Sequence, residues 1–169
     1  MLVPLGRSVT DVRDGDDASR IVTTLQSSLQ NEVDRLKKTS PITYWSDFAG
    51  YLNGTTPLYA SRDGSKVGPE LIGVGTPNPL WETDGVSGIS PDEHMEKFFE
   101  ITLTRNTALS PSGAANDQSA GFLAFNITLR WPGYVRFSQT EARRVYDHPT
   151  MASTKTQQSV LIIPAAVVR

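Results

Sequence analysis

Residues 17–38 read DASRIVTTLQSSLQNEVDRLKK, and the spacing of their apolar side chains decides the fold. The apolar residues recur every three or four positions, so they form one stripe along a helix. The opposite face carries polar residues such as Arg20, Gln30 and Asp34. We therefore predict an amphipathic helix that packs through its stripe, which consists of Ile21, Val22, Leu25, Leu29, Val33 and Leu36.

The charges beside the stripe predict where this helix begins and ends. Three aspartates within residues 14–17 lie where carboxylates favour a helix N-terminus, by capping and through the helix dipole. Lys37 and Lys38 lie where cations favour the C-terminus, and Pro41 prevents continuation. We expect a helix over about residues 9–38, with Gly15 as its weak point.

The rest of the chain, about residues 42–169, is expected to be β-rich. Residues 42–45 combine Ile, Thr, Tyr and Trp, which are all common in strands. Asp63-Gly64 between two apolar segments predicts a hairpin turn. Residues 68–92 are rich in proline and glycine and predict a long irregular loop.

Two later segments predict neighbouring antiparallel strands with one apolar face. Residues 98–105 place Phe99, Ile101 and Leu103 on one side, and residues 122–131 alternate in the same way from Phe125 onward. A small polar stretch, 110–119, predicts the hairpin loop between them. Residues 138–158 are expected to be loop with one short helix. Residues 160–168 are expected to form the last strand, which Pro164 makes an edge or bulged strand. This order predicts an α+β domain over residues 1–169, with a long N-terminal amphipathic helix packed on an antiparallel sheet.

Composition excludes several classes of protein. The 169 residues carry 16 basic and 18 acidic side chains, so charge gives no reason to expect nucleic acid. The sequence has no cysteine, which excludes disulfides and thiolate chemistry within it. Its longest apolar run, 160–168, is far shorter than the roughly 20 residues of a membrane-spanning helix.

Several short segments together resemble the type IV pilin superfamily, most closely minor pseudopilin-like proteins such as the prepilin-like proteins of verrucomicrobial cassettes. Leu2-Val3-Pro4-Leu5-Gly6 is similar to the junction that ends the membrane half of the family's helix. Residues 11–36 resemble the amphipathic half. Residues 58–64 are similar to a Tyr-Phe-Asp-x-x-Gly hairpin, and 98–105 with 125–132 resemble the paired strands.

The resemblance implies a structural subunit of a cell-envelope filament, in a type II secretion or type IV pilus-like system, that acts by assembly rather than catalysis. Its partners would be other pilin or pseudopilin subunits, and the membrane through a further N-terminal helix, but no nucleic acid. It would lie in the periplasm or at the cell surface, anchored to the inner membrane, and would need no cofactor or metal. Leu2, Val3 and Leu5 would form the filament-core junction, and the stripe would hold helix to sheet through Ile21, Leu25, Leu29, Val33 and Leu36.

The alternative is a secreted or surface ligand-binding module that uses the loops at 68–92 and 138–158. Basic and aromatic side chains between residues 130 and 146 could bind single-stranded nucleic acid. The acidic balance of the chain argues against this, and a subunit contact is favoured because Arg and Tyr are common at interfaces. These residues are Arg130, Arg136, Arg143, Arg144, Tyr134, Phe137 and Tyr146. We interpret Trp45 and Trp131 as core or loop anchors and leave Trp81 open.

Two acidic clusters could hold a metal, and the spacing argues against both. Taking Asp14 as the first ligand of a calcium loop places Leu25 where a glutamate is needed, so we interpret 14–17 as a helix start. In 92–96 only Asp92 and Glu96 share the i, i+4 spacing, which favours a solvated helical turn.

Enzyme motifs are incomplete. Ser87 lacks the Gly-x-Ser-x-Gly setting of a hydrolase, although His148 beside Asp147 could belong to a triad. Gly73-Val74-Gly75 lacks the third glycine and the following helix of a dinucleotide site. We therefore expect no enzyme activity.

Overall fold

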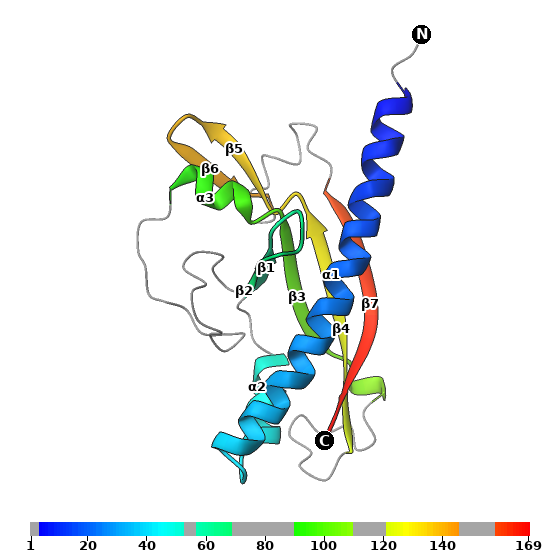
Figure 1. The fold of residues 1–169 in the computed structure, drawn as a ribbon, viewed down its shortest axis with the longest axis vertical. Helices are drawn as coiled ribbons and strands as arrows, with labels where there is room; N and C mark the ends of the chain where they lie inside the picture. The colour runs from blue at the N-terminus through cyan, green and yellow to red at the C-terminus, as the bar shows by residue number, and fades with distance from the viewer. Residues whose placement is uncertain (1–3, 53–56, 69–89, 110–120, 146–157) are drawn as a thin grey trace.

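The computed structural model describes residues 4–52, 57–68, 90–109, 121–145 and 158–169, with side chains in the first helix described from Arg13 onward. Helix α1 (Pro4–Thr39) packs across one face of an antiparallel sheet (Figure 1). The α+β class and the helix-on-sheet arrangement predicted from the sequence are confirmed for the helix from Arg13 to Thr39.

Helix α1 starts earlier than the aspartates predicted. It begins at Pro4, a residue suited to the first helical turn, and runs without interruption through Gly15. Asp14 therefore lies well inside the helix, where its carboxylate pairs with Arg62. The interpretation of 14–17 as the helix start is wrong, because Asp14 pairs with Arg62 instead of capping the helix, and the expected bounds of about 9–38 become 4–39. The C-terminal end is confirmed, with Lys37 and Lys38 in the last turn.

The strand expected at 42–45 is also wrong. A turn at 41–43 leads into helix α2 (Tyr44–Leu52). Five apolar residues of α2 recur with a helical period and are buried: Tyr44, Trp45, Phe48, Ala49 and Leu52. Thr43 starts the helix, since its carbonyl accepts from the Asp47 N–H (2.9 Å) and its hydroxyl donates to the Asp47 carboxylate (2.7 Å). Tertiary packing with this period outweighs the strand propensity of four residues.

Five of the described strands form an antiparallel sheet in the order β2-β1-β3-β4-β7. The strands are β1 (Leu58–Ala60), β2 (Val67–Gly68), β3 (Phe99–Arg105), β4 (Phe122–Trp131) and β7 (Ser159–Val168). The predicted hairpin at Asp63-Gly64 joins β1 and β2 and is confirmed, with Gly64 at φ 70°. β7 pairs only with β4 among the described strands, so the predicted edge strand is confirmed, and its register is regular through Pro164.

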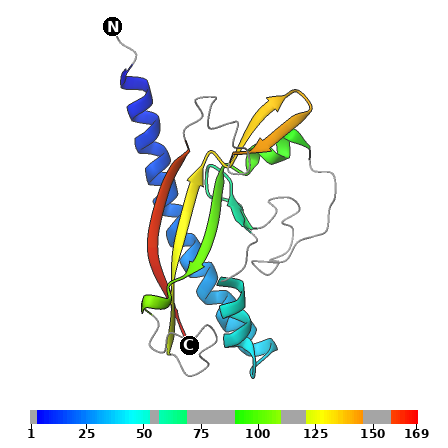
Figure 2. The same ribbon diagram turned by 180° about the vertical axis from the view of Figure 1, so that it is seen from behind.

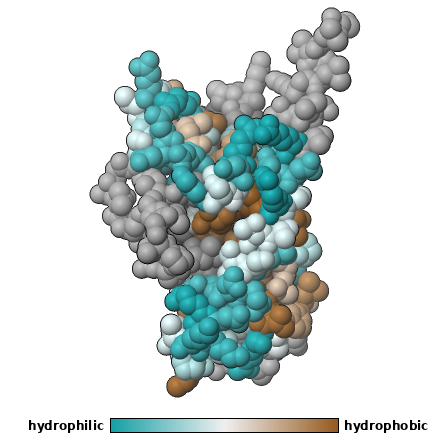
Figure 3. Space-filling view, viewed as in Figure 1, coloured by the Kyte–Doolittle hydropathy of each residue, from teal (hydrophilic) through white to brown (hydrophobic). Residues whose placement is uncertain are grey.

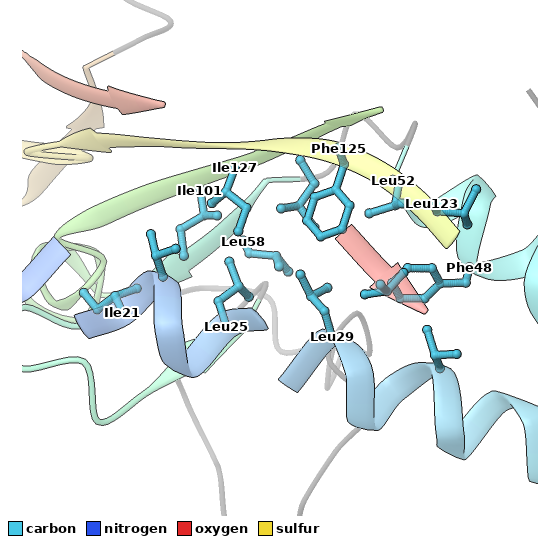
Figure 4. Packing of buried hydrophobic residues seen from close by; sticks show 14 of the residues in the cluster. Ile21, Leu25, Leu29, Phe48, Leu52, Leu58, Ile101, Leu123, Phe125 and Ile127 are labelled. Atoms are coloured by element: carbon cyan, nitrogen blue, oxygen red, sulfur yellow. The ribbon is translucent and has the colours of Figure 1, made fainter. Parts of the chain in front are cut away.

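The core lies between α1, α2 and the sheet (Figure 4). Strands β3 and β4 supply the predicted alternating residues Phe99, Ile101, Phe125, Ile127 and Leu129, each no more than 1% exposed. Because the side chains of a strand alternate, the opposite face carries Thr102, Asn126 and Thr128 and is not covered by α1.

A smaller unit lies beside the main sheet. Strands β5 (Tyr134–Ser138) and β6 (Glu141–Arg144) pair antiparallel and pack with helix α3 (Pro91–Glu96). The interpretation of 138–158 as loop with a short helix is wrong for 141–144, because these residues pair with the β-forming segment at 134–138. Residues 146–157 lie outside the described residues, as does the predicted hairpin loop at 110–119. Helix α3 confirms the helical turn expected at 92–96.

Candidate functional site

The stripe residues predicted to hold helix to sheet lie in the core. Ile21, Leu25 and Leu29 are at most 1% exposed and face sheet residues such as Ile101 and Ile127 (Figure 4). Val33 and Leu36 continue the stripe toward α2. Leu2 and Val3 lie outside the described residues, and Leu5 lies in α1 without a described side chain, so their role at a filament junction stays a prediction.

The opposite face of α1 is exposed and carries no charge over three turns. From Ile21 to Asn31 the sequence contains no Asp, Glu, Lys or Arg. The hydroxyls of this segment turn back to the helix, with Thr23 donating to the Ser19 carbonyl and Ser27 to the Thr23 carbonyl, both at 3.2 Å. Figure 3 shows a pale surface over this middle part of α1. We call this surface the neutral helix face; it consists of the exposed Thr23, Thr24, Ser27 and Asn31 and the half-buried Gln26 and Ser28.

The first turns of α1 extend past the sheet. In Figures 1 and 2 the N-terminal part of the helix projects beyond the end of β7, while its C-terminal half crosses the sheet to meet α2. At 1.5 Å per residue, the 36 residues of α1 span roughly 54 Å. The ten residues of β7 span roughly 33 Å. The helix is therefore longer than the sheet that covers it. None of the described helices is long and apolar enough to cross a membrane.

The turn between β1 and β2 docks on α1. Asp14 and Arg62 form an ion pair of 2.7 Å, and Arg20 donates to the Asp63 carbonyl at 3.4 Å. The Asp63 carboxylate accepts from the Ser61 hydroxyl and from the Ser65 backbone and side chain, and these hydrogen bonds lower its pKa to about 2. The carboxylate is therefore ionised at neutral pH and organises the turn.

A hollow of about 570 Å³ lies between this turn and α3. Its charged groups are engaged with one another or with neighbours: Lys66 with Glu96 at 2.8 Å, and Arg62 with Asp14 and with the Phe98 ring at 4.6 Å. Both cations that line the hollow, Arg62 and Lys66, therefore have carboxylate partners.

The candidate metal residues at 92–96 have structural roles. Ser90 and Glu93 form a capping box at the start of α3, and the Ser90 hydrogen bonds lower the pKa of Glu93. Asp92 pairs with Arg136. The pKa of His94 is lowered, first by burial and then by Lys97. Within the described residues, no group of three or more His, Asp or Glu converges on one point.

The predicted basic and aromatic set is divided among separate ion pairs. Arg144 binds the buried Glu100 with two hydrogen bonds (2.7 and 2.9 Å), and Arg130 lies 4.0 Å from the same carboxylate. Arg143 pairs with Glu141 and stacks on Phe137 at 3.7 Å. The four arginines therefore join elements to one another rather than forming a basic surface for nucleic acid.

Sequence reasoning missed the buried polar cluster under the β5–β6 unit. Glu100 is 1% exposed on the outer side of β3, and Lys97 is 4% exposed above the Tyr59 ring. Tyr134 stacks on His94 and contacts Tyr59. Burial, followed by the hydrogen bond with Tyr134, raises the pKa of Tyr59. The local sequence offered no signal for this cluster, because Glu100 lies on the polar side of the alternating strand with Thr102 and Thr104, where a charged residue is expected to be solvated.

Several other candidate residues lie outside the described residues. These are Ser87 and His148 of the hydrolase motif, Gly73 and Gly75, Tyr146, and Trp81, together with most of the loop at 68–92. Trp45 is buried beside α1 and Trp131 packs against the core, as anchors would.

Comparison with known proteins adds no relative. No family model, no curated protein and no solved structure matches this chain. The geometry of the chain itself is therefore the basis for any functional proposal.

Proposed function

We propose that this chain is a structural subunit of a cell-envelope filament, a minor pilin-like or pseudopilin-like protein that acts by assembly. The observation that carries the proposal is that different parts of helix α1 have different surroundings. One stripe of the helix holds the sheet, the opposite face is exposed and uncharged between Ile21 and Asn31, and the first turns project past the sheet.

The neutral helix face suits burial against another protein chain. Burying an unpaired charge costs several kcal/mol, whereas a hydroxyl that already has a hydrogen-bond partner costs far less. Thr23, Thr24, Ser27 and Ser28 each donate to a backbone carbonyl four residues earlier. Small side chains also let two helices approach to the short end of the roughly 8–10 Å range of interaxial distances.

The projecting end of α1 suits an anchor. In the proposed full-length protein, an apolar helix before Leu2 continues α1 into the inner membrane, and the described domain lies in the periplasm or at the cell surface. The partners are other pilin-like subunits of a type II secretion or type IV pilus-like system.

The test is the full-length gene and the location of its product. We expect the reading frame upstream of Met1 to encode a prepilin cleavage motif followed by roughly 20 apolar residues. We also expect an antibody to the domain to detect the protein in the inner-membrane fraction, and in the filament fraction when filaments are sheared from cells. A reading frame that starts at Met1, with the protein in the cytosolic fraction, would overturn the proposal.

A further inference from the structure

The face of the sheet opposite α1 is exposed and apolar along its edge strand β7, whereas Ala124 and Thr128 on the neighbouring strand β4 are only 4% and 9% exposed. In Figure 2, β7, β4 and β3 lie in front of α1, and no described helix lies in front of them. Alternate residues of β7 point to this side, and Val160, Ile162 and Val168 are 52%, 61% and 62% exposed. Phe122, opposite Val168 on β4, is 37% exposed. Pro164 and Ala166 complete the exposed stripe.

This outer face carries no charged side chain over most of its described length. The register places Ile162 beside Thr128 and Thr102, and Pro164 beside Asn126 and Thr104. Charged side chains occur in the next row of outward-facing residues, where Arg130 and Glu100 lie beside Val160 and close to Arg144. The face is thus apolar on β7 and neutral but polar on β3.

The open edge of β7 is protected against addition of another strand. Val168 is held by Gln30, whose amide donates to the Val168 carbonyl (3.2 Å) and accepts from its N–H (3.1 Å). The N–H of Arg169 points the opposite way, to the Gly121 carbonyl on the β4 side. Backbone groups alternate along a strand, so Pro164 shares the outward direction of Val168 and presents no donor at the edge. Contact through the face is therefore favoured over contact through the edge.

We propose that the outer face of β7, β4 and β3 is a self-association surface, which packs face to face on the same surface of a second copy about a two-fold axis. A neutral face meets its own copy without like-charge repulsion, which a charged face would suffer. Two twisted sheets pack in this way about 10 Å apart and roughly aligned. The inference does not depend on the filament proposal, because it concerns the isolated chain.

The size of the face sets the expected strength. The ten residues of β4 and of β7 each span about 33 Å and the seven residues of β3 about 24 Å, so three strands spaced about 4.8 Å apart give a footprint of roughly 430 Å². A standard stable interface buries about 800 Å² on each partner. The dimer is therefore weak and is populated only at high protein concentration. Nucleic acid does not suit a face without cations.

Sedimentation equilibrium of the 169-residue chain, up to about 1 mM, tests the proposal. We expect reversible dimerisation that Ile162→Glu weakens at least tenfold. The matched control is Ile42→Glu, the same change at an isoleucine that is 86% exposed in the turn after α1, and it should dimerise like the wild type. Thr104→Glu, an exposed position of the same face, provides a second disrupting variant if Ile162→Glu fails to fold.

A chain that stays monomeric up to about 1 mM would overturn the proposal. Dimerisation that Ile162→Glu and Thr104→Glu leave unchanged, or that Ile42→Glu weakens equally, would also overturn it. Binding to neutral phosphatidylcholine vesicles that Ile162→Glu abolishes, without self-association, would assign the face to lipid instead and contradict the second copy as its partner.

Discussion

Asp14 of helix α1 and Arg62 of the β1–β2 turn form an ion pair of 2.7 Å across 48 residues of sequence. Asp14 is 6% exposed, and the guanidinium of Arg62 also lies over the Phe98 ring. The pair fixes the long helix against the edge of the sheet near the point where the helix leaves it.

Replacing Arg62 with alanine should lower the free energy of unfolding by about 1–3 kcal/mol, because the buried Asp14 carboxylate loses its partner. Chemical denaturation measures this change. Arg13→Ala, an exposed arginine on the same helix, should change stability by less than about 0.5 kcal/mol. Equal effects of the two substitutions would contradict the role of the pair.

The helix stripe should dominate stability. Leu29 is 0% exposed between α1 and the sheet, so Leu29→Ala should cost about 2–5 kcal/mol by creating a cavity. Ile42→Ala, at an exposed position, should be close to neutral. Urea unfolding of both variants measures the change in the free energy of unfolding. A loss below about 1 kcal/mol for Leu29→Ala would show that α1 is not packed as described.

Two glycines should respond to alanine in opposite directions. Gly64 has φ 70°, and an added Cβ would lie 3.0 Å from Ile21, so Gly64→Ala should destabilise by about 1–2 kcal/mol. Gly15 lies inside α1 with nothing within 4 Å of an added Cβ, so Gly15→Ala should stabilise by about 0.5–1 kcal/mol. Thermal unfolding of the two variants shows whether each substitution raises or lowers the melting temperature. Stabilisation by Gly64→Ala would contradict the described turn.

The buried Glu100–Arg144 pair should couple the β5–β6 unit to the sheet. Arg144→Met leaves Glu100, 1% exposed, with Arg130 at 4.0 Å, and should cost about 3 kcal/mol. Arg143→Met, one residue earlier and paired with the exposed Glu141, should cost less than about 1 kcal/mol. A double-mutant cycle of Arg144→Met with Glu100→Gln should give a coupling energy above about 0.5 kcal/mol, and additive effects would argue against the pair.

The Asp63 turn should lose stability in acid. Its folded pKa of about 2 lies below the ordinary value of about 3.9, so its contribution is present above pH about 4 and is lost as pH falls toward 2. Ser65→Ala removes one hydroxyl donor and should raise the pKa of Asp63, as followed by NMR titration of the carboxyl carbon. Ser19→Ala, whose hydroxyl bonds the Gly15 carbonyl, is the control and should leave it unchanged.

Residue patterns over long windows predicted the fold better than short ones. The stripe from Ile21 to Leu36 and the alternation in 122–131 extend over many residues, and the structure confirms both. The strand predicted at 42–45 is wrong because four residues of strand propensity count for less than the helical period that continues to Leu52.

Contacts distant in sequence could not be inferred from local patterns. Asp14 looks like a helix-start residue until Arg62 is placed beside it, and Glu100 looks like a solvated position until Arg144 covers it. The neutral helix face could have been found from the sequence, since the absence of charge from Ile21 to Asn31 is visible there. Its exposure is a property of the folded protein.

Cysteine cross-linking in cells tests the central claim most directly, because the chain has no cysteine of its own. The full-length protein should carry Thr23→Cys on the neutral helix face or, as a control, Ile42→Cys on the exposed turn. Under oxidation, Thr23→Cys should yield disulfide-linked dimers or adducts in the cell envelope, and Ile42→Cys should not. Thr23→Cys chains that remain monomeric in intact cells would show that this face of α1 meets no neighbour and would contradict the account.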